Sequence, residues 1–170
     1  MVILFSGRKS AVEREIIEIL CGYGANYISD KAVLAGDGGF TIISEYKKTD
    51  INLKNGIAVF IDDTDRFENQ VFPDGITGIC EDKNITALGI FKASGIPVIS
   101  CGMSAKNTVT LSSLGSGSLL ASLQRTVTDL SGGEVEPGEF KIKLTKPYTH
   151  FAVMASAAVL LLSGIVPDVF

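Results

Sequence analysis

The stretch Gly-Ile-Ala-Val-Phe-Ile-Asp-Asp at residues 56–63 decides the fold. Its apolar run, Ile57–Ile61, is too short for a helix and is rich in residues that favour strands. A run that is apolar on both faces is typical of a strand buried in a parallel sheet with helices on either side. Asp62 and Asp63 stop the run abruptly. We expect them at the carboxyl end of the strand, where ligands gather in open α/β sheets.

A strand, a turn and a helix are predicted at the start of the chain. Val2–Phe5 is a short apolar strand that runs into a doubly basic turn, and Ser10 with Glu13 forms a capping box that begins a helix. Free backbone amides and the helix dipole make such a turn a candidate anion site, although a solvated surface loop is the alternative. The candidate anion-binding residues are Gly7, Arg8, Lys9 and Ser10.

The pattern of apolar residues changes about two thirds of the way along the chain. Up to residue 104, apolar runs such as Ile76–Cys80 and Pro97–Cys101 flank a predicted helix, which is a βαβ unit with a parallel crossover. From residue 105, apolar and polar residues alternate, as in an antiparallel meander with one solvated face. A last segment, capped by Thr149 and reaching Leu162, is apolar nearly all round and is therefore predicted to be a buried helix.

These patterns predict one α/β domain over residues 1–170. Its Rossmann-like, mainly parallel sheet occupies residues 1–104, and its C-terminal antiparallel β-meander and final buried helix occupy residues 105–170. The composition agrees, because 170 residues with 46% hydrophobic and 20% charged side chains are typical of one globular domain.

Composition also narrows the classes of function. The net charge of −4 gives no basic surplus, so we expect no nucleic-acid partner. The apolar segment 151–166 is shorter than the roughly 20 residues that cross a bilayer, so we expect no membrane partner. Three widely spaced cysteines and no signal peptide predict a cytoplasmic location. A single histidine, His150, leaves no His-rich metal site or catalytic triad.

The order of elements resembles the central domain of the Mur ligases, ATP-dependent enzymes that add amino acids to peptidoglycan precursors. Val59–Asp63 is similar to the family's strand ending in Asn-x-Asp-Asp-Pro, and Pro97–Ser104 is similar to its strand ending in Phe-Gly-x-Ser. Gly138–Ile142 and the small-residue helix Thr149–Ile165 are similar to its last strand and its Ala-Ala helix. The resemblance implies an ATP-binding fold, with ATP and Mg²⁺ as its cofactors.

Departures from the family argue against a complete ligase. The family's P-loop reads Gly-Thr-x-Gly-Lys-Thr/Ser, whereas Ser6–Ser10 is a shortened, degenerate version in which Arg8 replaces the glycine before Lys9. Fewer backbone amides can then converge on the phosphates. The family's His-Asn-x-x-Asn falls on His150, Phe151 and Met154, so both asparagines are lost. The family's metal-binding segment and its two other domains have no counterpart in the sequence.

Two carboxylates and one thiol have alternative interpretations. Asp62 and Asp63 would suit a magnesium ion or a ribose, but aspartates also suit a strand end and the turn that follows it. Cys101, before Gly102, would suit a nucleophile at a strand end, yet no neighbouring base can be named, and a buried structural cysteine is the alternative. We therefore assign no catalytic residue and no metal ligand.

Two functions follow from these patterns, neither of them enzymatic. In the first, the chain is a non-ligase module that binds a nucleotide or another small anionic ligand through the Gly7–Ser10 turn and Asp62 or Asp63. In the second, it is a catalytically inactive scaffold for a protein partner, as a homo-oligomer or beside cell-wall enzymes. The shortened turn favours the second function, and Lys9 and Ser10 favour the first.

Overall fold

The computed structural model describes residues 1–7, 10–63, 65–113 and 117–170. The described helices are α1 (Ala11–Gly22), α2 (Ile85–Ser94) and α3 (His150–Leu162), and a 3₁₀ turn, η1, covers Asp65–Phe67. The described strands are β1 (Val2–Phe5), β2 (Asn26–Ile28), β3 (Val33–Leu34), β4 (Thr41–Glu45), β5 (Gly56–Phe60), β6 (Ile76–Glu81), β7 (Val98–Cys101), β8 (Val109–Ser113), β9 (Ser118–Leu123), β10 (Val127–Thr128), β11 (Glu134–Val135) and β12 (Gly138–Lys143).

Within the described residues, ten of these strands form one sheet in the order β12-β9-β8-β7-β6-β5-β1-β4-β2-β3. The strands from β7 to β2 are mutually parallel, and β5 lies between β1 and β6. Every residue of β5 is buried, and Ile61 beyond it is only 8% exposed. The prediction of a buried central strand in a mainly parallel sheet is therefore confirmed.

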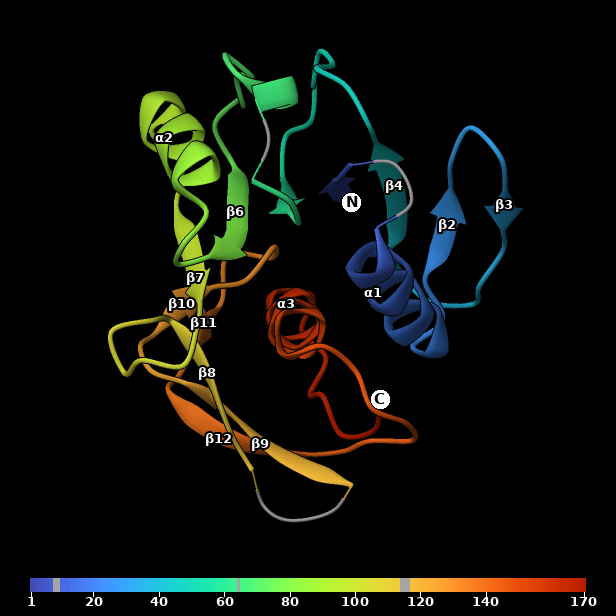
Figure 1. Cartoon of the computed structure of the whole chain (residues 1–170), viewed down its shortest axis with the longest axis vertical. Helices are drawn as coiled ribbons and strands as arrows, with labels where there is room; N and C mark the ends of the chain where they lie inside the picture. Colours follow the sequence, from blue (N-terminus) through green and yellow to red (C-terminus); the bar gives the residue numbers. More distant parts are fainter. Residues whose placement is uncertain (8–9, 64, 114–116) are drawn as a thin grey trace.

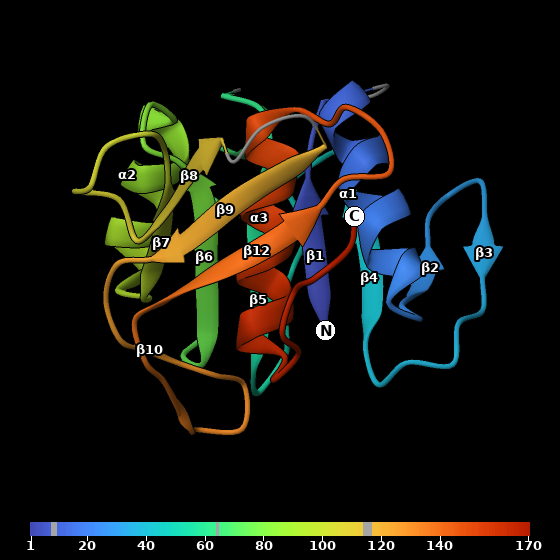
Figure 2. The same cartoon turned by 90° about the horizontal axis from the view of Figure 1, so that it is seen from below.

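The predicted antiparallel meander extends this same sheet. β8 pairs in parallel with β7 through Cys101 and Val109, and then β8, β9 and β12 pair antiparallel to one another. Figure 1 shows the sheet curling around α3, and Figure 2 shows β9 and β12 crossing over this helix. The short strands β10 and β11 pair with each other in a separate ribbon, which the sequence pattern did not separate from the meander.

Hydrophobic cores lie on both faces of the sheet. On one face α1 and α3 pack over Val2, Leu4 and Val59, and every residue of α3 from Phe151 to Leu162 is buried, as predicted. On the other face α2 and η1 enclose a cluster of phenylalanines, in which the rings of Phe5 and Phe60 stack with centroids 4.7 Å apart. Successive β1 side chains alternate between the two cores, which is why this strand is apolar throughout.

The start of α3 differs from the prediction. Thr149 precedes the helix, but its hydroxyl makes no capping hydrogen bond to it. The hydroxyl donates instead to Oε2 of Glu15 on α1, at 2.7 Å. The backbone amide of Thr149 donates to the same oxygen at 2.8 Å, so the residue is oriented toward α1, and its hydroxyl oxygen does not accept a helix amide. None of the helices in the described part of the chain has the length and apolarity needed to cross a membrane.

Candidate ligand site at the carboxyl edge of the sheet

The carboxyl ends of β1 and β5 meet at a topological switch point. The connection after β1 runs through α1 on one face of the sheet, whereas the connection after β5 runs through η1 on the other. Adjacent parallel strands whose connections diverge in this way leave a crevice between their ends, where α/β proteins bind ligands. Gly7 follows β1 and Asp62 follows β5 at this point.

Gly7 and Asp62 are joined directly. The backbone amide of Gly7 donates a hydrogen bond of 2.6 Å to Oδ2 of Asp62. A Cβ atom on Gly7 would lie 3.2 Å from the same oxygen, so the carboxylate fills the space in front of the residue. Two parts of the predicted site are thus brought together, and the carboxylate stands where a bound anion would accept this amide.

The other predicted site residues are Ser10, Asp63, Arg8 and Lys9. Ser10 Oγ accepts the amide of Glu13 at 3.4 Å, which is long for such a hydrogen bond. Asp63 is exposed beyond Asp62. Arg8 and Lys9 lie outside the described residues.

This arrangement does not fit a nucleotide phosphate as it stands. A phosphate at Gly7 would have to displace Asp62 and would meet a second negative charge there. Within the described residues, no group of three or more His, Cys, Asp or Glu side chains is placed to hold a metal ion.

Cys101 is the last residue of β7. It is completely buried, and burial raises the pKa of its thiol well above the usual value. Burial likewise raises the pKa of Cys80, on the neighbouring strand β6, to about 12. A thiol that is protonated and shielded from solvent is a poor nucleophile, so the structural interpretation is the better one. His150 is exposed at the first position of α3.

A polar cluster that the sequence pattern did not predict lies on the β4 side of β1, where Glu13 and Tyr46 meet. Glu13 is only 3% exposed, and its Oε1 has no hydrogen-bond partner among the residues that the structure describes. Burial raises the pKa of the Tyr46 phenol to about 12, and the nearby Glu13 carboxylate adds to this rise. The sequence did contain a signal for the burial of Glu13, because this residue shares the apolar face of α1 with Ile16 and Leu20. Its capping role does not require that position.

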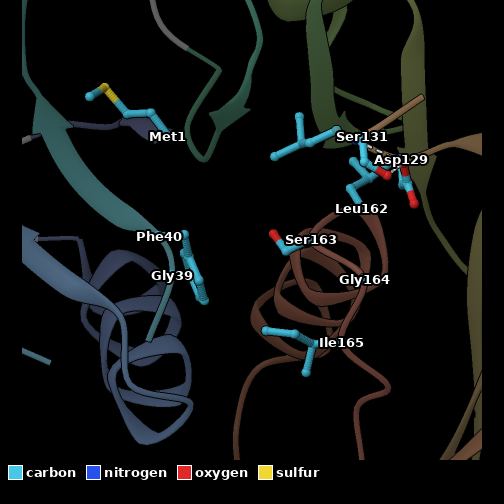
Figure 3. A pocket seen from close by; sticks show the side chains of 10 residues that line it. Met1, Gly39, Phe40, Asp129, Ser131, Leu162, Ser163, Gly164 and Ile165 are labelled. Carbon is cyan, nitrogen blue, oxygen red and sulfur yellow. Dashed lines mark hydrogen bonds between the residues drawn. The ribbon is translucent and has the colours of Figure 1, made fainter. Parts of the chain in front are cut away.

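A cavity of about 400 Å³ lies at the opposite end of the sheet. In Figure 3, Met1 and Phe40 lie on one side of it, and Asp129, Ser131 and Ser163 lie on the other. The cavity contains none of the predicted site residues and is separate from the switch point.

Comparison with known proteins gives structural matches only, since no family model and no curated protein matches the sequence. One match is the UDP-N-acetylmuramoylalanyl-D-glutamyl-2,6-diaminopimelate–D-alanyl-D-alanyl ligase of Acinetobacter baumannii, with a TM-score of 0.53 and 11% identity over 97% of this chain and 43% of the ligase chain. A second structure, of MurF from Acinetobacter baumannii, has a TM-score of 0.54 and 10% identity over 97% of this chain and 42% of its own.

A third match is the UDP-N-acetylmuramate:L-alanyl-gamma-D-glutamyl-meso-diaminopimelate ligase (MPL) of Neisseria meningitides. It has a TM-score of 0.54 and 10% identity over 99% of this chain and 62% of its own. The present chain thus spans 42–62% of the length of these three ligase chains. At such low identity the likeness concerns the fold. The chain therefore has a Mur-ligase-like α/β fold, as the resemblance in its sequence implied.

Proposed function

We propose that this chain is a non-ligase module that uses its Mur-ligase-like fold as a catalytically inactive scaffold for a protein partner. The observation that carries the proposal is the hydrogen bond from Gly7 to Asp62. Phosphate-binding turns hold their ligand with free backbone amides and nearby positive charge. Here a carboxylate of the chain itself accepts the Gly7 amide at the end of β1, which supports a role other than holding a nucleotide phosphate.

Exposed apolar residues support a role in protein interaction. Val33 and Leu34 on the edge strand β3 are 75% and 50% exposed, and the neighbouring Ile28 on β2 is 41% exposed. An edge strand with apolar side chains is a typical surface for strand pairing or docking. A second copy of the chain and a cell-wall enzyme are the two partners we consider. The cysteines are unpaired, which supports a reducing, cytoplasmic setting.

Calorimetric titration with ATP, with and without Mg²⁺, tests the loss of nucleotide binding. We expect no heat of binding and no change in melting temperature for the wild type, since a ligand at 100 times its Kd would add about 2.7 kcal/mol of stability. Asp62→Ala exposes the Gly7 amide and removes the competing charge, so this variant is expected to gain weak binding of ATP or sulfate. A wild-type Kd for ATP tighter than about 1 mM would overturn the proposal.

Light scattering of the purified protein during gel filtration tests the identity of the partner. If a second copy binds through β3, the wild type should be dimeric and Val33→Asp should be monomeric. A monomeric wild type would leave only a different protein as partner. A dimer that Val33→Asp does not weaken would remove β3 as the interface.

Binding of a small anionic ligand is the second candidate. It is favoured by the long hydrogen bond of Ser10, whose hydroxyl is held only weakly by α1. In this case Asp62 has to leave Gly7, and Lys9→Ala should weaken the binding of ATP and sulfate without changing stability. Lys92→Ala, an exposed lysine on α2, is the matched control. Binding by the wild type that is lost only in Lys9→Ala would establish this candidate in place of the scaffold.

A further inference from the structure

The cavity of about 400 Å³ lies where the amino ends of β1 and β4 meet the carboxyl end of α3. Met1 directly precedes β1, Phe40 directly precedes β4, and Ser163 directly follows the helix, and all three residues line the cavity. A cavity of this volume has the size of a site for a small organic molecule.

Hydrogen bonds hold one wall of the cavity in place. The amide of Leu130, in the turn 129–133 between β10 and β11, donates to the carbonyl of Leu162 at the end of α3, at 2.9 Å. Nδ2 of Asn55, which directly precedes β5, donates to the carbonyl of Leu130 at 3.1 Å. The turn is thus joined to both the helix and the sheet. The cavity is therefore preformed, which lowers the cost of binding a ligand.

Apolar side chains form much of the lining. Leu130 and Ile165 are only half-buried, so part of each side chain remains uncovered by the rest of the protein. Leu162 and Phe40 contribute further apolar groups, and Phe40 is the aromatic residue of the described lining. A ligand with an apolar body is stabilised by covering such surface, and an aromatic body can pack against the phenylalanine ring.

One hydroxyl in the wall has no partner among the described residues. The Oγ of Ser163 is buried and makes no hydrogen bond there. The backbone amide of Ser163 is bonded to the carbonyls of Val159 and Leu160, so the residue is fixed at the end of α3. Figure 3 shows its hydroxyl pointing into the space between the helix end and Phe40. A hydroxyl group of a ligand could complete this unpaired group.

The charge distribution disfavours an anion. Asp129 is the one charged side chain among the described lining residues, and the described last turn of α3 has no basic residue to offset the negative end of the helix dipole. Oδ1 of Asp129 already accepts the hydroxyl and the amide of Ser131 and the amide of Gly133. Asp129 therefore repels anions, while its Oδ1 offers little to a cation.

We propose that this cavity binds a small uncharged molecule with an aromatic body and one hydroxyl group, which forms a hydrogen bond with Ser163. The apolar walls receive the body, and the free Oγ at the end of α3 receives the hydroxyl. The site lies at the amino ends of the strands, whereas Gly7 and Asp62 meet at their carboxyl ends. The proposal is therefore independent of the scaffold role and of the Gly7–Ser10 turn.

Titration of ¹⁵N-labelled protein with phenol, followed by NMR, tests the site. A ligand this small is expected to bind with a Kd of about 1 mM. Saturable shifts should appear at the amides of Phe40, Leu130 and Ser163. Toluene has nearly the same shape but no hydroxyl, and serves as the second probe. Benzoate should produce no saturable shift at these amides, because its charge is repelled.

Ser163→Ala is the decisive variant, because it removes the hydroxyl and leaves the apolar walls intact. The Kd for phenol should rise about three- to tenfold, while the Kd for toluene should not rise. Ser156→Ala is the matched control: its hydroxyl is also buried on α3 without a partner among the described residues, but Ser156 is not in the described lining. Neither variant should melt at a lower temperature, since neither loses a described hydrogen bond.

Gly39→Leu tests the cavity by a different route. A Cβ on Gly39 would meet nothing within 4 Å, and Gly39 lines the cavity, so the new side chain can be accommodated and should occupy part of the space. Both phenol and toluene should then lose binding. Gly89→Leu on α2, where a Cβ would also meet nothing within 4 Å, is the control and should bind both probes like the wild type.

Several results would overturn the proposal. These are the absence of saturable shifts with phenol, shifts that map to another part of the protein, and tighter binding of benzoate or of benzylammonium than of phenol. An equal loss of phenol and toluene binding in Ser163→Ala would also overturn it, because the serine hydroxyl would then not recognise the ligand hydroxyl. So would unchanged phenol binding in both Ser163→Ala and Gly39→Leu.

Discussion

The hydroxyl of Tyr23 donates a hydrogen bond of 2.7 Å to Oδ1 of Asp168, which lies 145 positions later in the chain. The same hydroxyl oxygen accepts the backbone amides of Asp168 and Val169, at 2.9 and 3.1 Å. The ring of Phe170 packs edge-on against the ring of Tyr23, and Val169 bridges to Lys143 at the end of β12. One side chain at the end of α1 thus holds residues 168–170 against the edge of the sheet.

Tyr23→Phe should therefore destabilise the protein. The variant keeps the ring contact but removes the hydroxyl that accepts these two amides, and a net hydrogen bond contributes about 0.5–1.5 kcal/mol. We expect a loss of about 1–2 kcal/mol in the free energy of unfolding by urea. Tyr148→Phe is the control, because the Tyr148 hydroxyl donates a long bond of 3.3 Å to the exposed Glu18, and this variant should lose much less stability. Equal losses in the two variants would contradict this explanation.

Gly78 should not tolerate a methyl group. It lies within β6, and a Cβ there would come within 2.7 Å of three atoms of the Phe91 ring on α2. Since the ring is completely buried and cannot move freely, Gly78→Ala should cost about 1–3 kcal/mol of stability.

Gly89→Ala provides the matched comparison. Gly89 lies inside α2, and a Cβ there would meet nothing within 4 Å. Alanine has the higher helix propensity, so this change should stabilise the protein by up to about 1 kcal/mol. Thermal unfolding of both variants would show opposite signs. A neutral Gly78→Ala would mean that α2 packs less closely on β6 than described.

Leu161→Ala should produce one of the larger losses. Leu161 is 5% exposed in α3, around which the sheet curls, so its truncation leaves a cavity that the surrounding strands cannot close. The expected cost is about 2–5 kcal/mol in chemical denaturation. Ile85→Ala, at the start of α2, is the control, because its side chain is 76% exposed and should contribute little. A small effect at Leu161 would show that α3 is not held in the core.

Asp129 should titrate below its ordinary range. Its Oδ1 accepts the hydroxyl of Ser131 at 2.7 Å and the amides of Ser131 and Gly133, each at 2.8 Å. These hydrogen bonds lower the pKa of Asp129, and the bond from the Ser131 hydroxyl has the largest effect. The contribution of Asp129 to stability is therefore complete above the unfolded pKa of about 3.9 and is lost as the pH falls through the lower folded pKa.

NMR titration of the Asp129 carboxyl, with amide exchange of residues 129–133, measures this dependence. Protection of the amides of residues 129–133 from exchange should fall only in strong acid. In Asp129→Asn this protection should no longer depend on acid. An unperturbed titration curve would show that the loop hydrogen bonds are not formed in solution.

The elements of the fold were predictable because each depends on local pattern. The run Ile57–Ile61 is apolar on both faces, which suits only a strand covered on both sides, and it is the buried β5. Ser10 marked a helix start through its side-chain chemistry, and it is the N-cap residue of α1. The prediction that Thr149 caps α3 was wrong, because contacts with the distant carboxylate of Glu15 orient this residue toward α1.

The candidate sites depended much more on distant contacts. The sequence by itself identified the turn after β1 and Asp62 as polar features at strand ends, because the apolar pattern stops there. Only the tertiary structure showed that the Gly7 amide binds Asp62, since the two residues are 55 positions apart and their contact depends on β1 pairing with β5.

The burial of Glu13 was likewise decided by packing. A glutamate in the first turn of a helix satisfies the capping rule whether or not the helix end is covered, so local pattern cannot distinguish the two cases. The sequence therefore determined which segments become strands and helices, through short-range periodicity and backbone preferences. The fold alone decided which polar groups lose water and which partners they find, because both depend on segments that meet only when the sheet has formed.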